Sequence, residues 1–176
     1  LLLGAIGYII ADLAGAFPDD TTQAPDDTSS PITDTASHPS TNAYDGNSET
    51  YYLSTSKQTA GVYFTVSFTN EVSVSSIEIV SSNPDYYIRR ASVALSTDNK
   101  NWTAVGECSG TDASSITLTE PVYESHLRIM ISESADVLFA INEITVKDSF
   151  GTAAIVRGAM AGQTIGGVPD DGDTTT

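Results

Sequence analysis

A short polar loop in the first third of the chain gathers the oxygen atoms that a metal ion needs. Asp45-Gly46-Asn47 is followed by Thr50, which places carboxylate, amide, hydroxyl and backbone carbonyl oxygens close together. Ca²⁺ takes about six to eight such ligands, so the loop is a candidate calcium site. Glu143, near the last predicted strand, is a candidate for the carboxylate that completes the charge balance. The alternative is a metal-free turn, to which these residue types are equally suited.

The elements that must position this loop are β-strands. Apolar side chains alternate with smaller or polar ones in several short runs, the pattern of half-buried strands. These runs are marked by Val62–Phe68, Ala91–Leu95, Leu127–Ile131 and Ile144–Val146. The alternation slips by one residue at Ser75-Ser76, which predicts a β-bulge, and Asn83-Pro84-Asp85 predicts a turn. Repeated short strands with polar turns predict an antiparallel sandwich or barrel.

Four segments, taken in order, resemble a known family. The stretch Ala43–Ser54 is similar to the opening signature of the coagulation-factor type C, or discoidin, domain, and especially of family 32 carbohydrate-binding modules. Three later segments are similar to further strands of that family: Val93–Trp102, His126–Ile129 and Ile141–Val146. The resemblance covers about 115 of the 176 residues. It departs from the family where Tyr51-Tyr52 replaces the usual end of the first loop.

The resemblance implies an all-β, antiparallel jelly-roll β-sandwich. It also implies how the family's structural calcium ion would be held here, by Ala43, Asp45, Asn47, Thr50 and Glu143. In the family this ion ties the first loop to the last strand, and most members bind glycans.

A sugar site would need an aromatic face and a few planar hydrogen-bonding groups. In these modules the aromatic platform often comes from the loop before the closing strand, which here contains Phe139. Asn83, Tyr86 and Arg89 lie on or beside the turn before another strand and would line the same rim. The alternative is that Phe139 and Tyr86 pack inside the fold, as most aromatic residues of small sandwiches do.

Composition makes several partners and activities unfavourable. The chain carries 7 Lys and Arg against 23 Asp and Glu, a net charge of −16. This field repels nucleic acid and anionic membrane surfaces. The single cysteine, Cys108, provides no disulfide within the chain, and we expect a buried, inert thiol. Because metalloprotease and hydrolase motifs and a Cys pair are absent from the sequence, we expect no enzyme activity.

Two apolar arms flank the predicted sandwich. The sequence divides into an apolar arm at 1–17, a Pro/Asp/Thr-rich linker at 18–31, the sandwich at 32–147, and a Gly-rich apolar arm with an acidic tail at 148–176. Leu1–Phe17 is shorter than the roughly 20 residues that span a membrane. Exposed apolar arms favour association. Three partners are open for the arm at 1–17: the sandwich itself, another copy of the chain, or a membrane.

Two functional hypotheses follow. The first is a non-enzymatic extracellular module that binds a glycan or cell-surface polysaccharide and serves adhesion on a cell surface or virion. The second is a structural subunit of a filament, sheath or virion. In that case the arms mediate self-assembly and the sandwich is a scaffold.

Overall fold

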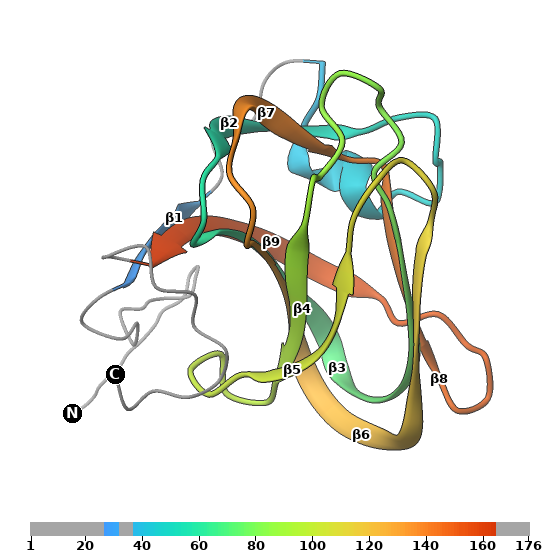
Figure 1. Cartoon of the computed structure of the whole chain (residues 1–176). Coiled ribbons are helices and arrows are strands. Elements are labelled where there is room, and N and C mark those ends of the chain that lie inside the picture. The colour runs from blue at the N-terminus through green and yellow to red at the C-terminus, as the bar shows by residue number, and fades with distance from the viewer. Residues whose placement is uncertain (1–26, 32–36, 165–176) are drawn as a thin grey trace.

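The computed structural model describes residues 27–31 and 37–164, and these form one antiparallel β-structure (Figure 1). The strands are β1 (Asp27–Pro31), β2 (Tyr52–Gln58), β3 (Val62–Val80), β4 (Ala91–Ser96), β5 (Thr103–Cys108), β6 (Ser114–Ile131), β7 (Ala135–Ile141), β8 (Glu143–Asp148) and β9 (Val156–Thr164). A short 3₁₀ helix, η1 (Ser40–Tyr44), precedes β2. The predicted all-β antiparallel sandwich is therefore confirmed. None of the helices in the described residues has the length and apolarity to cross a bilayer.

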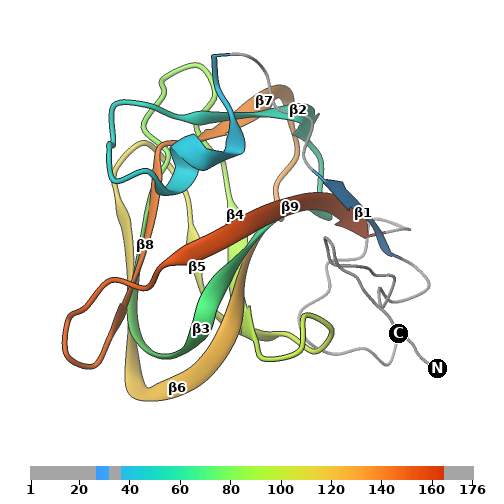
Figure 2. The same cartoon turned by 180° about the vertical axis from the view of Figure 1, so that it is seen from behind.

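The long strands β3 and β6 organise the sheet. The main sheet has the order β1-β9-β3-β6-β4-β5, and β8 also pairs with β3. Residues 62–68 of β3 pair with β9, whereas residues 74–80 pair with β8. Figure 2 shows β3 and β6 curving together between these two parts. The predicted bulge is confirmed, because the register of β3 shifts between Val74 and Ser76.

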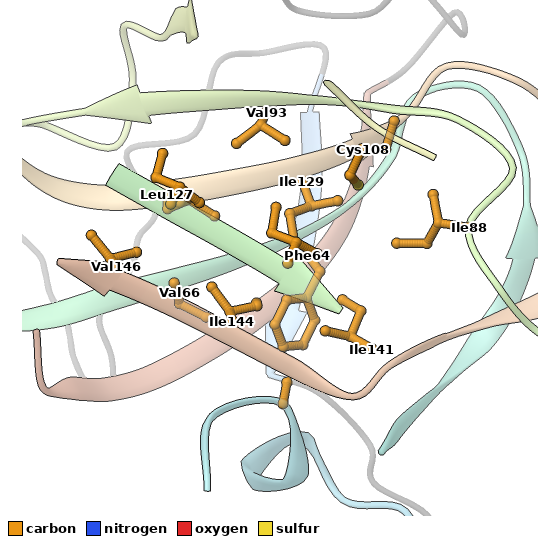
Figure 3. Packing of buried hydrophobic residues seen from close by; sticks show 14 of the residues in the cluster. Phe64, Val66, Ile88, Val93, Cys108, Leu127, Ile129, Ile141, Ile144 and Val146 are labelled. Atoms are coloured by element: carbon orange, nitrogen blue, oxygen red, sulfur yellow. The ribbon is translucent and has the colours of Figure 1, made fainter. Parts of the chain in front are cut away.

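The core lies between the two parts of this curved sheet. Phe64 and Val66 from one half of β3 belong to the same buried cluster as Ile77 and Ile79 from the other half. Strands β4 and β6 add the alternating side chains that the sequence predicted, among them Val93 and Leu127 (Figure 3). Burying one such side chain stabilises the fold by about 1.5–3 kcal/mol.

The predicted turn before β4 and the lone cysteine behave as the sequence predicts. Residues 84–86 form the turn that was expected at Asn83-Pro84-Asp85. Asn99 adopts a positive φ of 62° in the β4–β5 turn, a conformation that Asn tolerates better than most residues. Cys108 is buried and free, and its burial, followed by the nearby Glu107 charge, raises the pKa of the thiol to about 12. The thiol is therefore uncharged at neutral pH, which fits the inert role expected for it.

The predicted domain limits were too narrow at both ends. Strand β9 lies in residues assigned to the C-terminal arm, and it pairs with both β3 and β1 of its own chain. Strand β1 lies in residues assigned to the linker. The error has a physical cause: β9 is rich in Gly and Ala, so its sequence lacks the large alternating side chains that indicate a strand. The predicted arm at 1–17 lies outside the described residues.

We predict that ending the chain at Lys147, the limit expected from sequence, will destabilise the sandwich. The truncation removes β9, exposes the edge of β3 at residues 62–68, and removes Val156 and Ala159 from beside the core. A loss of several kcal/mol corresponds to a fall of about 10 °C or more in the unfolding midpoint. Thermal unfolding followed by circular dichroism measures it, and an unchanged midpoint would show that β9 is dispensable.

Candidate functional site

The first loop is held to the start of β8 by one glutamate. The backbone N–H of Gly46 donates to both carboxylate oxygens of Glu143, with N–O distances of 3.2 and 3.1 Å. Gly46 has a φ of 79°, a conformation that residues with a Cβ rarely adopt. The predicted proximity of Glu143 to this loop is confirmed, because the structure brings the two together across 97 positions of the chain.

The loop is closed internally by Asp45. One carboxylate oxygen, Oδ1, accepts from the N–H of Asn47 at 2.9 Å, and Oδ2 accepts from the Thr50 hydroxyl at 2.6 Å. The Thr50 hydroxyl also lies 2.9 Å from the Asn47 carbonyl oxygen. Four of the five predicted metal ligands therefore lie in direct contact with one another or with Gly46. The fifth, Ala43, is buried in η1 just before them.

The two carboxylates of the site have opposite pKa shifts. Burial raises the pKa of Glu143 to about 7; the Gly46 N–H opposes this shift, and the negative charge of Asp45 adds to it. Burial also acts to raise the pKa of Asp45, but hydrogen bonds from Thr50 and Asn47 outweigh it and leave that pKa below its ordinary value. The proximity of two carboxylates thus makes a second negative charge unfavourable here.

This donor set fits a hard divalent cation. It contains only oxygen atoms: two carboxylates, a hydroxyl, and the carbonyl groups of Ala43 and Asn47. A cation would favour the ionised form of Glu143, which the site otherwise disfavours. No group of three or more His, Cys, Asp or Glu side chains suited to a metal ion occurs within residues 27–31 and 37–164. If an ion were held here, carbonyl and hydroxyl oxygens would provide most of its coordination, as Ca²⁺ accepts.

Asn142 connects this loop to the turn before β4. Its side-chain N–H donates to the Ser48 carbonyl at 3.0 Å, and its Oδ1 accepts from the N–H of Ser82 at 2.9 Å. Asn142 is itself only 5% exposed. The loop at 45–50 and the turn at 82–86 are therefore parts of one connected structure. Nothing in the sequence pattern pointed to this role of Asn142.

Gln58 is a second connector, at the end of β2. Its side-chain nitrogen donates to the carbonyls of Tyr87 at 2.9 Å and Leu138 at 3.2 Å. Its side-chain oxygen accepts from the N–H of Arg89 at 3.0 Å. Since Gln58 is 1% exposed, these bonds are shielded from water, and one side chain joins β2, β7 and the segment before β4.

The segment held by Gln58 presents an aromatic and cationic surface, which we call the Tyr87 rim (Asn83, Tyr86, Tyr87 and Arg89). The Arg89 guanidinium lies 3.8 Å from the centre of the Tyr87 ring, and its Nη1 donates to the Tyr87 carbonyl at 2.7 Å. All four side chains are partly exposed. The sequence pattern predicts three of these residues for the rim but not Tyr87, although Tyr87 adjoins Tyr86.

Asn83 serves the turn with its side-chain oxygen. Oδ1 accepts from the N–H groups of Asp85 and Tyr86, at 2.9 and 3.1 Å. The amide NH₂ group of Asn83 remains available as a donor, because the described residues provide no acceptor for it. Asn83 can therefore hold the turn and still contribute a hydrogen bond to a ligand.

Phe139 does not belong to the rim. It is 1% exposed, and its ring packs edge-on against Tyr52 with 6.2 Å between ring centres. Its backbone N–H donates to the Ser54 hydroxyl at 2.9 Å. The expectation that Phe139 forms an exposed sugar platform is therefore wrong. Strand alternation explains it: β7 pairs with β2, and this pairing turns the Phe139 side chain into the core.

Comparison with known proteins gives one family. The family model described as F5/8 type C domain matches residues 26–144 of this chain. No curated protein matches it in sequence.

Several solved structures share the fold. CBM32-1 from a family 31 glycoside hydrolase of Clostridium perfringens is similar with a TM-score of 0.59 and 16% identity, over 69% of this chain and 94% of that one. The family 32 module of C. perfringens NanJ, solved with galactose, gives a TM-score of 0.55 and 20% identity, over 69% and 93% of the two chains. A pectin-binding carbohydrate-binding module gives a TM-score of 0.52 and 26% identity, over 70% and 89%. These similarities confirm the jelly-roll sandwich.

We predict that Gln58→Ala lowers the free energy of unfolding by about 3 kcal/mol. The change leaves three buried backbone groups without their partner, and each unpaired group costs about 1–3 kcal/mol. Denaturant titration measures the difference. The neighbouring Lys57→Ala is the control, because it removes only an exposed ion pair with Asp136, worth at most about 1 kcal/mol. An equally small decrease in the free energy of unfolding in both variants would contradict the role of Gln58.

Proposed function

This chain belongs to the F5/8 type C domain family, and we propose that it is a non-catalytic module that binds carbohydrate at the Tyr87 rim. The observation that carries the proposal is the stacked pair of Arg89 and Tyr87, fixed in place by the buried Gln58. A planar guanidinium stacked over an aromatic ring offers an apolar plane edged by N–H donors, which suits a sugar ring with an apolar face and a hydroxylated edge.

The rim is ready for a ligand before it binds. Gln58 fixes both ends of the Tyr87–Arg89 segment, and Ser81 fixes its middle by accepting from the N–H of Ile88 at 2.9 Å. Ser81 also donates to the Ala140 carbonyl at 2.6 Å, which links the segment to β7. A surface ordered in advance loses less entropy on binding, which favours recognition of weakly bound ligands such as sugars.

Similar proteins support a carbohydrate as the ligand class. One structural neighbour is named for pectin binding and another was solved with galactose. Polysaccharides of this kind lie outside cells, so we place the module on a cell surface or in the extracellular medium. The alternative of assembly through two apolar arms has less support, because residues 156–164 of the C-terminal arm are already paired within the sheet.

We also propose that the first loop binds a structural Ca²⁺ ion through Asp45, Thr50, Glu143 and the carbonyls of Ala43 and Asn47. The facing carboxylates of Asp45 and Glu143 support this proposal. Because Asn142 joins the same loop to the turn of the Tyr87 rim, an ion here would stiffen the frame of the rim rather than contact the sugar.

For the rim, we predict that Tyr87→Ala and Arg89→Ala each weaken sugar binding about tenfold, the effect of losing roughly 1.4 kcal/mol of stacking and hydrogen bonding. Calorimetric titration with galactose-terminated oligosaccharides and with pectin fragments provides the measurement. Lys100→Ala, which removes an exposed cation from the turn between β4 and β5, is the matched control for Arg89→Ala and should bind normally. No binding of either sugar class, or full binding by Tyr87→Ala, would rule out this site.

For the ion, we predict a pH-dependent stabilisation. Without Ca²⁺, stability falls as pH rises from about 4.5 to about 7, because folded Glu143 still holds a proton that the unfolded chain has released. Ca²⁺ binds the ionised site, so its addition should raise the unfolding midpoint more at about pH 8 than at about pH 5.

Glu143→Gln is the matched variant for this prediction, because it keeps an oxygen acceptor for Gly46 but removes the titrating charge. The variant should abolish both the fall in the free energy of unfolding with rising pH and the rise in unfolding midpoint that Ca²⁺ causes. Thermal unfolding with Ca²⁺ or with a chelator tests both. An equal rise in midpoint in the variant and the parent protein would exclude the proposed ligand set.

A further inference from the structure

A groove of about 270 Å³ lies away from the Tyr87 rim, at the bend of the long strands. Its walls come from residues 69–73 of β3, from Tyr123 of β6, and from residues 148–150 and 152–155 of the β8–β9 hairpin. Figure 1 shows this hairpin at the lower right, whereas β2 and β7, which support the rim, lie at the top. Figure 2 shows the same separation from behind, so the groove and the rim occupy different ends of the sandwich.

The groove collects most of the large apolar side chains that the described residues expose. Four such side chains are exposed, and three of them line the groove: Phe150 is 91% exposed, Ile155 is 73% exposed and Tyr123 is 65% exposed. The fourth, Val122, is the sequence neighbour of Tyr123. Apolar residues exposed singly are ordinary, but a contiguous group marks a binding surface.

Phe150 is held by a closed turn rather than by a loose loop. The carboxylate Oδ1 of Asp148 accepts from the N–H groups of Phe150 and Thr152, both at 2.9 Å. The N–H of Gly151 donates to the Asp148 carbonyl at 2.9 Å, and Gly151 has the positive φ of 83° that this turn requires. The hairpin therefore fixes the position of the Phe150 backbone before any ligand arrives.

The charged residues that line the groove are all acidic. Glu71 and Asp148 belong to its lining, and none of the lining residues is basic. Lys147 and Arg157 flank the hairpin in sequence, but neither lines the groove. Burial is the main cause of the raised pKa of the neighbouring Glu124, and the negative charges of Glu71 and Asp98 add to it.

The remaining lining residues suit a small hydroxylated ligand. Thr69, Ser73, Ser149 and Thr152 present hydroxyl groups, and Asn70 presents an amide. The volume is below the roughly 300–1,000 Å³ of pockets for drug-sized ligands, so a single ring fits better than an extended peptide. Aromatic rings beside hydroxyls and carboxylates match a ring that has one apolar face and a positive charge.

We propose that this groove is a second carbohydrate-binding site, specific for a sugar ring with a free amine. Phe150 and Tyr123 contact the apolar face of the ring, and Glu71 and Asp148 attract its ammonium group. This site is independent of the Tyr87 rim, so each can be present or absent without the other. A chain with both sites would bind polysaccharide at two points, which raises its avidity where both are reached together.

The test is a residue-resolved nuclear magnetic resonance titration of the full chain. The probes are a β-1,4-linked glucosamine hexamer and the same hexamer with every amine acetylated. We expect the amine-bearing hexamer to shift the amide signals of Asn70, Phe150 and Thr152, and to bind about tenfold more tightly than the acetylated one. Equal affinity for the two hexamers, or shifts confined to residues 83–89, would overturn the proposal.

Variants separate specific binding from attraction between a polycation and an acidic protein. Phe150→Ala leaves the net charge unchanged and should weaken binding about tenfold, whereas Phe150→Tyr keeps the ring and should bind normally. Asp148→Asn keeps the Oδ1 acceptor of the turn but removes a negative charge. It should reduce the ratio between the affinity for the amine-bearing hexamer and the affinity for the acetylated one. Full binding by Phe150→Ala would contradict the site.

A lysine hexamer is the last probe, because a basic peptide is the competing ligand class. We expect it to bind weakly and equally to the parent protein and to Phe150→Ala. Tight binding of the peptide that is lost in Phe150→Ala would show that the groove recognises peptides, and the saccharide proposal would fail. Binding of galactose or pectin fragments at residues 83–89 tests the Tyr87 rim separately.

Discussion

Every polar group of irregular backbone that is buried beside a core must find a partner, and this requirement shapes one end of the sandwich. Four buried side chains satisfy it there: Ser54, Gln58, Ser81 and Asn142. Each bonds to backbone groups that the regular strand ladders leave unpaired. Together they join the first loop, the turn before β4 and the β2–β7 pair, so the candidate sugar rim is built on a fixed frame.

The long strand β3 determines how the two ends of the molecule differ. Its second half pairs with β8 and leads into the turn of the Tyr87 rim, while its bend at residues 69–73 lines the groove. Polar connectors hold the rim, and a tight hairpin turn displays apolar rings beside the groove. One sandwich thus carries two surfaces with different charge and geometry, a cationic rim and an acidic groove.

Sequence alone predicted the parts that depend on local pattern. Alternation identified the central strands and the bulge near Ser75, and the first-loop motif identified the contact between that loop and Glu143. Sequence patterns did not predict the features that depend on tertiary contacts. The burial of Phe139 depends on pairing with β2, and β9 lacks the regular alternation of large apolar side chains that marks a strand. A glutamine such as Gln58 carries no pattern that separates a buried connector from a solvated residue.

Native-state hydrogen exchange at the amides of Ile88, Arg89 and Phe139 tests most directly whether the rim is part of a fixed frame. These N–H groups donate to Ser81, Gln58 and Ser54, respectively. The account predicts that they exchange almost as slowly as the central amides of β3, through global unfolding. Rapid exchange, at the rate of an exposed loop, would show that the buried side chains do not hold the rim and would contradict the account.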